Sequence, residues 1–143
     1  MKSFLFSLVA LALCGACSQN TGVTSPDGTI RLAFAVDSAG RMTYSVTDGG
    51  VRLFEPSRLG FEAAEADLGG GFAVEHVSRT SVDETWTQPW GENKRNRSRY
   101  NEMAVALHRG GEVRLTMRFR LFDDGLGFRY EYEVPACDSL VVT

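Results

Sequence analysis

Both tryptophans of the chain lie within one ten-residue stretch, Asp83 to Glu92, which also holds three carboxylates, a proline and a glycine. Trp86 and Trp90 offer flat apolar faces near the carboxylate of Glu92, and a sugar ring combines apolar faces with outward hydroxyl groups. Stacking on a carbohydrate and accepting its hydroxyl hydrogens is therefore the chemistry that this stretch could do. The alternative is that the two indoles plug one end of the core, because aromatic side chains dominate core burial whatever their function.

Two other carboxylates, Asp123 and Asp124, could bind a hard cation or form the acid pair of a glycosidase. They precede Gly125 between two alternating segments, which is typical of a tight hairpin turn, and we assign them to that turn. His76 stands alone, whereas metal sites need several ligands, so we interpret it as structural. The sequence shows no phosphate loop, zinc-ligand spacing or nucleophile elbow, and we predict no catalytic and no metal-binding residue in it.

The composition is that of an ordinary soluble globular domain, with 143 residues, 43% hydrophobic and 23% charged, and a formal net charge of −3. This length allows one domain with a real hydrophobic core. Cations and anions are interspersed without a basic block, which argues against nucleic acid as a partner. Small or neutral partners fit this surface better.

The first residues have the pattern of a secretion signal, because Lys2 precedes an apolar run from Phe4 to Leu13 and small residues follow. The apolar run is shorter than the roughly 20 residues that a membrane-spanning helix needs. We therefore predict a signal peptide over 1–16 and export of the protein.

Cys14-Gly15-Ala16-Cys17 resembles the lipobox of bacterial lipoproteins, although Cys14 stands where leucine is usual. We predict that Cys17 is lipidated and that residues 17–24 form a polar tether, which would hold the domain near a membrane surface. Cys137 would then have no partner, so we expect no intramolecular disulfide.

After the tether, apolar and polar residues alternate with a period of two, which indicates β-strands. Turn clusters separate the segments, and the 3.6-residue period of a helix is absent. We predict an all-β fold, an antiparallel β-sandwich over 25–143 that is incomplete at the C-terminus, where 140–143 is an apolar run. The alternating segments are 30–36, 42–47, 51–54, 59–63, 72–82, 103–107, 113–121 and 128–134.

Two irregularities are expected within these strands. Pro56 cannot donate a hydrogen bond to a central ladder, so the chain around it should form a sheet edge or a bend. The alternation breaks near His76, and a bulge between Glu75 and Val77 would restore it.

Charged residues predict two further features. Arginines alternate with apolar residues in 113–121, as glutamates do in 128–134, so ion pairs should link these two strands. The segment 93–99 contains four cations and is expected to be a solvated loop.

A set of motifs runs through the chain in a fixed order: Ser25-Pro26-Asp27-Gly28, Asp83-Glu84-Thr85-Trp86, Pro89-Trp90-Gly91-Glu92, Tyr100-Asn101-Glu102 and the run from Phe119 to Tyr130. In this order the motifs resemble the amino-terminal domain of glycoside hydrolase family 97. The resemblance covers most of the chain after its leader. It implies a β-supersandwich placed before a catalytic (β/α)8 barrel, in an enzyme that acts on α-glucosides or α-galactosides with calcium at its active site.

The resemblance implies that the barrel supplies the catalytic groups and that the calcium ligand of this domain lies beyond Thr143. The chain is then expected to shape the substrate cleft or to brace the barrel, with Trp86, Trp90 and Glu92 contacting an oligo- or polysaccharide, and to be inactive alone. The leader implies a lipid-anchored protein of the periplasm or outer membrane of a Gram-negative bacterium. The alternative function is a non-catalytic surface lipoprotein that binds glycan through the same aromatic residues.

Overall fold

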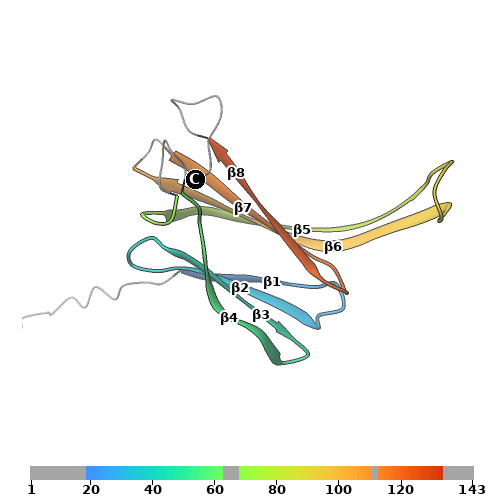
Figure 1. Ribbon diagram of the computed structural model, residues 1–143, viewed down its shortest axis with the longest axis horizontal. Coiled ribbons are helices and arrows are strands. Elements are labelled where there is room, and N and C mark those ends of the chain that lie inside the picture. Colours follow the sequence, from blue (N-terminus) through green and yellow to red (C-terminus); the bar gives the residue numbers. More distant parts are fainter. Residues whose placement is uncertain (1–18, 63–67, 111–112, 134–143) are drawn as a thin grey trace, which may run out of the picture.

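The computed structural model describes residues 19–62, 68–110 and 113–133, which form two four-stranded antiparallel sheets (Figure 1). Within each sheet every strand pairs with the one that follows it, and the predicted all-β sandwich is confirmed. The first sheet contains β1 (Gln19–Thr24), β2 (Ile30–Val36), β3 (Met42–Asp48) and β4 (Val51–Leu59) in spatial order. The second contains β5 (Ala73–Thr87), β6 (Arg95–Arg109), β7 (Val113–Leu121) and β8 (Leu126–Glu133).

Several predictions concern residues outside this described part of the chain, and they stay predictions. They are the signal peptide over 1–16, the lipidation of Cys17, the unpaired Cys137 and the apolar run at 140–143. In the described ranges, the structure contains no helix that is long and apolar enough to cross a membrane.

The alternation of apolar and polar residues decides which face of each sheet enters the core. On β2, Phe34 is fully buried while its neighbour Ala33 is exposed, and on β7 Phe119 is fully buried between two partly exposed arginines. The ring centroids of Phe34 and Phe119 lie 5.6 Å apart, which brings the two sheets face to face. Burying a large apolar side chain contributes roughly 1.5–3 kcal/mol. The cluster that contains these residues therefore supplies most of the stabilisation of the sandwich.

Strand β1 corrects the prediction of a polar tether over 17–24. Residues Gln19–Thr24 pair with β2, from Gln19 opposite Val36 to Thr24 opposite Arg31. The tether prediction is wrong for them, because Val23 buries its side chain in the core and pairing with β2 satisfies the backbone. The domain thus begins before residue 25, in a segment whose composition is mostly polar.

The two expected irregularities are present. Pro56 lies in β4, which is an edge strand of the first sheet, as predicted. One strand, β4, replaces the two strands predicted over 51–54 and 59–63, and it ends at Leu59. Register shifts in the pairing of β3 with β4, on either side of Val46, accommodate the irregularity around Pro56. In β5 the bulge falls between Val74 and His76, one position earlier than expected.

Cross-strand ion pairs link β7 and β8, as predicted. Arg118 donates two hydrogen bonds to Glu131, at 2.8 and 2.9 Å. Glu102 of β6 accepts hydrogen bonds from Arg118 at 2.5 Å and from Arg120 at 2.6 Å, and Arg129 approaches Glu131 to 2.6 Å. A one-residue slip of either strand would move these charges to the other face of the sheet, so the network penalises a wrong register.

We expect acid to destabilise this domain between about pH 5 and pH 2. The hydrogen bonds from Arg118 lower the pKa of Glu131 from 4.5 to about 2, against the opposing effect of burial. An acid with a lowered pKa in the folded state stabilises that state above its unfolded pKa and loses this contribution as the pH falls through the folded value. As the pH is lowered through this window, the melting temperature of a Glu131→Gln variant should therefore decline less steeply than that of the unchanged chain.

The control for this experiment is Glu55→Gln. Glu55 pairs with Arg52 of its own strand, and its side chain is 78% exposed. The melting temperature of the Glu55→Gln variant should depend on pH in the same way as that of the unchanged chain. Parallel curves for Glu131→Gln and the unchanged chain would contradict the assignment.

Candidate functional site

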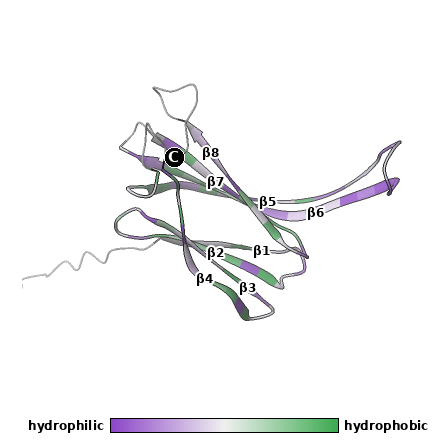
Figure 2. Cartoon of the chain, viewed as in Figure 1, coloured by the Kyte–Doolittle hydropathy of each residue, from purple (hydrophilic) through white to green (hydrophobic). Residues whose placement is uncertain are grey.

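Strands β5 and β6 extend beyond the rest of their sheet as a two-stranded ribbon. The described pairs between β7 and β6 run from Asn101 to Arg109, whereas β5 pairs with β6 out to Arg95. We call residues 82–100 the arm; Figure 1 shows it projecting away from the sheets, and Figure 2 shows hydrophilic residues along its outer part. The solvated loop predicted over 93–99 is therefore wrong from Arg95 onward, although the cations of this segment are exposed.

The arm carries all three residues that were predicted to bind a sugar. Trp86 lies on β5 opposite Asn96 and is 45% exposed, so it stands on a strand and not in a loop as the sequence indicated. Trp90 lies in the tip, residues 88–94, and is 78% exposed, and Glu92 is exposed in the same tip. Neither indole belongs to the described core, so the alternative that they plug the sandwich is wrong within the described chain.

An isolated two-stranded ribbon is only marginally stable in water, so the arm needs further stabilisation. Charge pairing and backbone hydrogen bonds provide it. The guanidinium group of Arg97 donates to both carboxylate oxygens of Asp83, at 2.8 and 2.7 Å, and these bonds lower the pKa of Asp83. At the tip, the backbone N–H of Gln88 donates to the carbonyl oxygen of Lys94 at 3.0 Å. The tip that holds Trp90 is thus closed by a defined turn.

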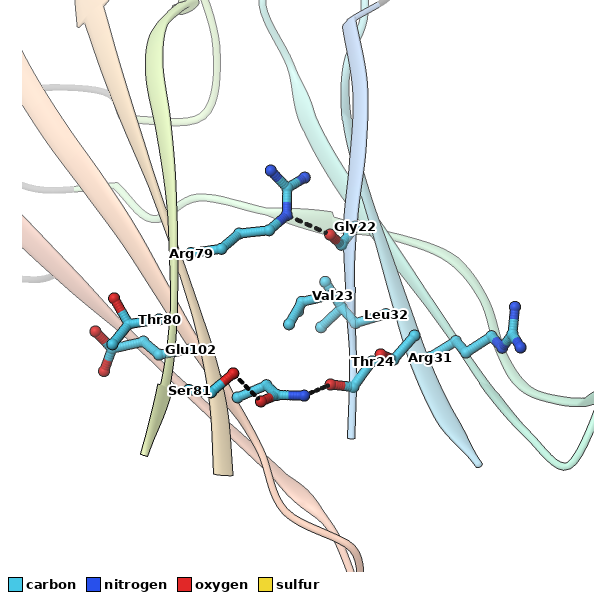
Figure 3. A pocket seen from close by; sticks show the side chains of 10 residues that line it. Gly22, Val23, Thr24, Arg31, Leu32, Arg79, Thr80, Ser81 and Glu102 are labelled. Atoms are coloured by element: carbon cyan, nitrogen blue, oxygen red, sulfur yellow. Dashed lines mark hydrogen bonds between the residues drawn. The ribbon is translucent and has the colours of Figure 1, made fainter. Parts of the chain in front are cut away.

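Polar side chains at the base of the arm fasten it to β1. Arg79 of β5 donates to the carbonyl oxygen of Gly22 at 3.0 Å (Figure 3), and Asn101 of β6 donates to that of Thr24 at 2.8 Å. Ser81 donates to the side-chain oxygen of Asn101 at 2.7 Å. These residues line a groove of about 490 Å³ between β1 and the base of the arm. Since Arg79 and Asn101 are engaged in bonds across the groove to β1, we assign them to positioning the arm.

A second set of contacts joins the arm to two turns. Arg99 forms an ion pair with Asp123 at 3.5 Å and donates to the carbonyl oxygen of Pro26 at 3.3 Å. The carboxylate of Asp123 also accepts a hydrogen bond from the backbone N–H of Asp27 at 2.9 Å, across 96 positions of sequence. Asp123 therefore serves the β7–β8 turn, as predicted, and also links that turn to the β1–β2 turn and to the arm. The sequence analysis did not predict this link. The one indication in the sequence was that Asp27, Arg99 and Asp123 lie in or beside the motifs shared with the family.

The described carboxylates do not form a metal centre, and five of them have a lowered pKa. The described ranges contain no group of three or more histidine, cysteine, aspartate or glutamate side chains that could hold a metal ion, whereas calcium takes six to eight oxygen ligands. These residues therefore do not fit the calcium that the resemblance implies. Hydrogen bonds to the ionised form outweigh burial and lower the pKa of Asp27, Asp37, Asp83, Glu102 and Glu131. A general acid needs the opposite shift.

Comparison with known proteins gives consistent matches. The family model described as Glycosyl-hydrolase 97 N-terminal matches residues 23–143. A probable retaining alpha-galactosidase from Streptomyces bingchenggensis (strain BCW-1) is 30% identical over 93 residues, which are 65% of this chain and 15% of the relative. A Glycoside Hydrolase Family 97 enzyme from Pseudoalteromonas sp. strain K8, in complex with panose, is 29% identical with a TM-score of 0.78, over 86% of this chain and 19% of that enzyme.

A second solved structure, a beta-arabinopyranosidase, is 26% identical with a TM-score of 0.71, over 84% of this chain and 19% of that protein. The TM-scores of both structures agree with the sandwich architecture described above. The chain spans less than a fifth of the length of these relatives.

Proposed function

The chain belongs to the family of glycosyl hydrolase 97 N-terminal domains, and from that premise we propose that it forms the amino-terminal domain of an exported α-glycosidase. The proposed substrates are oligo- or polysaccharides that contain α-glucosides or α-galactosides. A (β/α)8 barrel of the same parent protein would supply the catalytic groups. The chain alone is expected to be inactive, since hydrolysis requires two carboxyl groups about 5–9.5 Å apart across the scissile bond.

The observation that carries this proposal is the exposure of the indoles on a positioned arm. Trp90 is 78% exposed and Trp86 is 45% exposed, while Arg99 and Asn101 fix the base of the arm to the sandwich. A large apolar surface that stays exposed in one domain commonly marks a binding site. We propose that the arm reaches the substrate cleft of the parent enzyme, where the two indoles stack on sugar rings and Glu92 accepts hydroxyl hydrogens.

The names of the relatives support a carbohydrate as the ligand. One relative is named an alpha-galactosidase, and structures of the Pseudoalteromonas enzyme contain panose or acarbose. We propose that this chain serves a ligand of the same chemical class. No feature of the described chain favours the alternative of a glycan-binding lipoprotein without a catalytic barrel.

Replacing Trp90 with alanine in the whole parent enzyme is expected to raise KM for an oligosaccharide roughly 2- to 10-fold, because a stacked aromatic contact contributes about 0.5–1.5 kcal/mol. The melting temperature should change little, since the indole lies outside the core. Steady-state kinetics and a thermal melt measure the two effects. Trp86→Ala should behave in the same way with a smaller change, because Trp86 is less exposed.

Val51→Ala is the matched control for the tryptophan variants. Val51 is an exposed apolar residue on β4, in the other sheet, and its replacement should leave KM unchanged. If both tryptophan variants lower the melting temperature of the parent and leave KM unaltered, the arm braces the catalytic domain and does not contact the sugar.

We also propose that the protein is anchored to a membrane of a Gram-negative bacterium through a lipid on Cys17. A Cys17→Ser variant should move from the membrane fraction to the soluble periplasmic fraction, because stable attachment depends on the acyl chains. Cell fractionation followed by immunoblotting measures the distribution. Cys137→Ser is the matched control and should stay with the membranes. An unchanged distribution of the Cys17 variant would rule out lipidation at this residue.

A further inference from the structure

Strand β1 leaves very little chain between the folded domain and Cys17. The strand begins at Gln19 and pairs with β2 from its first residue, where Gln19 lies opposite Val36. A chain extends by at most about 3.6 Å per residue, so the step of two residues from Cys17 to Gln19 reaches no farther than about 7 Å in any conformation. One headgroup layer of a bilayer is of similar thickness, roughly 5–8 Å. A lipid on Cys17 would therefore hold the first residue of β1 at the membrane surface.

The start of β1 belongs to one end of the sandwich, which we call the blunt end. Among the described residues, it consists of the turn between β2 and β3, residues 37–41, and of residues 70–72, which pack against that turn. The backbone N–H of Gly71, for example, donates to the carbonyl oxygen of Ala39 at 3.0 Å. Figure 1 shows the start of β1 and the turn between β2 and β3 on the same side of the molecule. Any surface that holds the start of β1 therefore also faces this turn.

The blunt end is compatible with lipid headgroups. Anionic lipids attract basic residues and repel acidic ones. The single carboxylate of the turn belongs to Asp37, and it pairs with Arg41 at 2.7 Å. Arg109 adds a cation, since its guanidinium lies 5.4 Å from the centroid of the Phe72 ring in the same region. The blunt end thus carries no excess of negative charge, and a small side chain, that of Ser38, is exposed in its turn.

The arm lies at the other end of β1. Arg79 contacts β1 at Gly22, and Asn101, at the base of the arm, contacts it farther along the strand at Thr24. Each step from Gln19 along β1 therefore leads toward the arm, and Figure 1 shows the arm and the start of β1 at opposite ends of the molecule. A strand advances about 3.3 Å per residue, so the tip of the arm lies roughly 35 Å from the blunt end.

We propose that the blunt end rests on the lipid headgroups and that the arm points away from the membrane. The proposal depends on the proposed lipid at Cys17 and not on the ligand of the arm. Exposed tryptophans often lie in the interface of a membrane. Here the short connection at Cys17 places Trp90 at the far end instead, where a glycan would approach from the aqueous phase.

A fluorophore at one of two positions in the acylated parent protein tests this orientation. It is attached at Ser38→Cys, in the blunt end, or at Asp124→Cys, in the β7–β8 turn, with Cys137 and any other free cysteine replaced by serine. Both positions are exposed, and Asp123 connects the β7–β8 turn to the base of the arm.

The membranes are vesicles of phosphatidylethanolamine and phosphatidylglycerol that contain a lipid with a nitroxide on its headgroup, which quenches a fluorophore only at close range. The fluorophore at position 38 should lose most of its fluorescence, whereas the one at position 124 should keep it. Equal quenching at the two positions, or stronger quenching at position 124, would overturn the proposal.

A flexible insertion tests whether the short connection sets the orientation. A glycine- and serine-rich insertion of about 20 residues between Ser18 and Gln19 spans roughly 25 Å. The protein should still float with the vesicles, but the fluorophore at position 38 should recover its fluorescence. Quenching that survives the insertion would show that the short connection does not orient the domain, and it would overturn the proposal. A parent protein that fails to float even without the insertion would instead refute the lipid on Cys17, and the orientation with it.

Discussion

Replacing Phe119 with alanine is expected to lower the melting temperature of the domain by roughly 10–30 °C, or to unfold it at room temperature. Phe119 is fully buried, and its ring lies 5.6 Å from that of Phe34 in the first sheet and 6.0 Å from that of Phe128 on β8. Removing it leaves a cavity between the sheets and costs about 3–5 kcal/mol. Small domains have total stabilities of only about 5–15 kcal/mol.

Thermal unfolding followed by circular dichroism measures this effect. Phe119→Leu is the graded control, because it keeps most of the apolar volume and should lose much less stability than alanine. Trp90→Ala is the surface control, since it removes an aromatic side chain that is 78% exposed. If Phe119→Ala melts within a few degrees of Trp90→Ala, the packing of the two sheets described here is not what stabilises the domain.

The second large effect is expected at Gly40, in the turn between β2 and β3. Its φ angle is +71°, and a Cβ atom there would lie 2.3 Å from the backbone nitrogen of Phe72 and 2.5 Å from the carbonyl carbon of Gly71. The segment that it meets is held by hydrogen bonds from Gly71 to Ala39 at 3.0 Å and from Phe72 to Gly40 at 3.1 Å. Gly40→Ala should therefore cost about 2–5 kcal/mol, the sum of a strained backbone and an overpacked contact.

Gly49→Ala separates these two contributions. Gly49 also has a positive φ angle, +55°, but no atom lies within 4 Å of the position that its Cβ would occupy. This variant should lose only the conformational part, about 1–2 kcal/mol. Urea denaturation of both variants gives the comparison directly. Equal losses at Gly40 and Gly49 would show that the close approach of residues 71–72 does not hold in solution.

The sequence alone was sufficient to predict the strands in which alternation is regular. Along β2 and β7 every second residue is apolar, and these residues are buried throughout β2 and from Leu115 to Leu121 of β7. The pairing of Arg118 with Glu131 could also be predicted from the sequence, because the short turn at Gly125 brings β7 and β8 together in one register. These features depend on residues within one hairpin. The family could be recognised for a related reason, since its motifs are short and follow one another along the chain.

Other features required the tertiary structure. Thr21, Gly22 and Val23 have no strong strand pattern, yet they form part of β1 because β2 offers a partner for their backbone. Trp86 stands on a strand because β6 continues opposite it, and it is exposed because the pairs with β7 begin only at Asn101. No pattern in the sequence around Trp86 reports the length of a neighbouring strand.

The sequence by itself therefore determined that this protein is an antiparallel sandwich of its family, with hairpins in the right places and tryptophans in one segment. The tertiary structure decided that those tryptophans lie outside the core on an arm, and that Asp27, Arg99 and Asp123 meet at its base. The reason is physical. Alternation is dictated by the geometry of one strand and can be read locally, whereas exposure and long-range contact depend on which strands lie opposite and how far each extends.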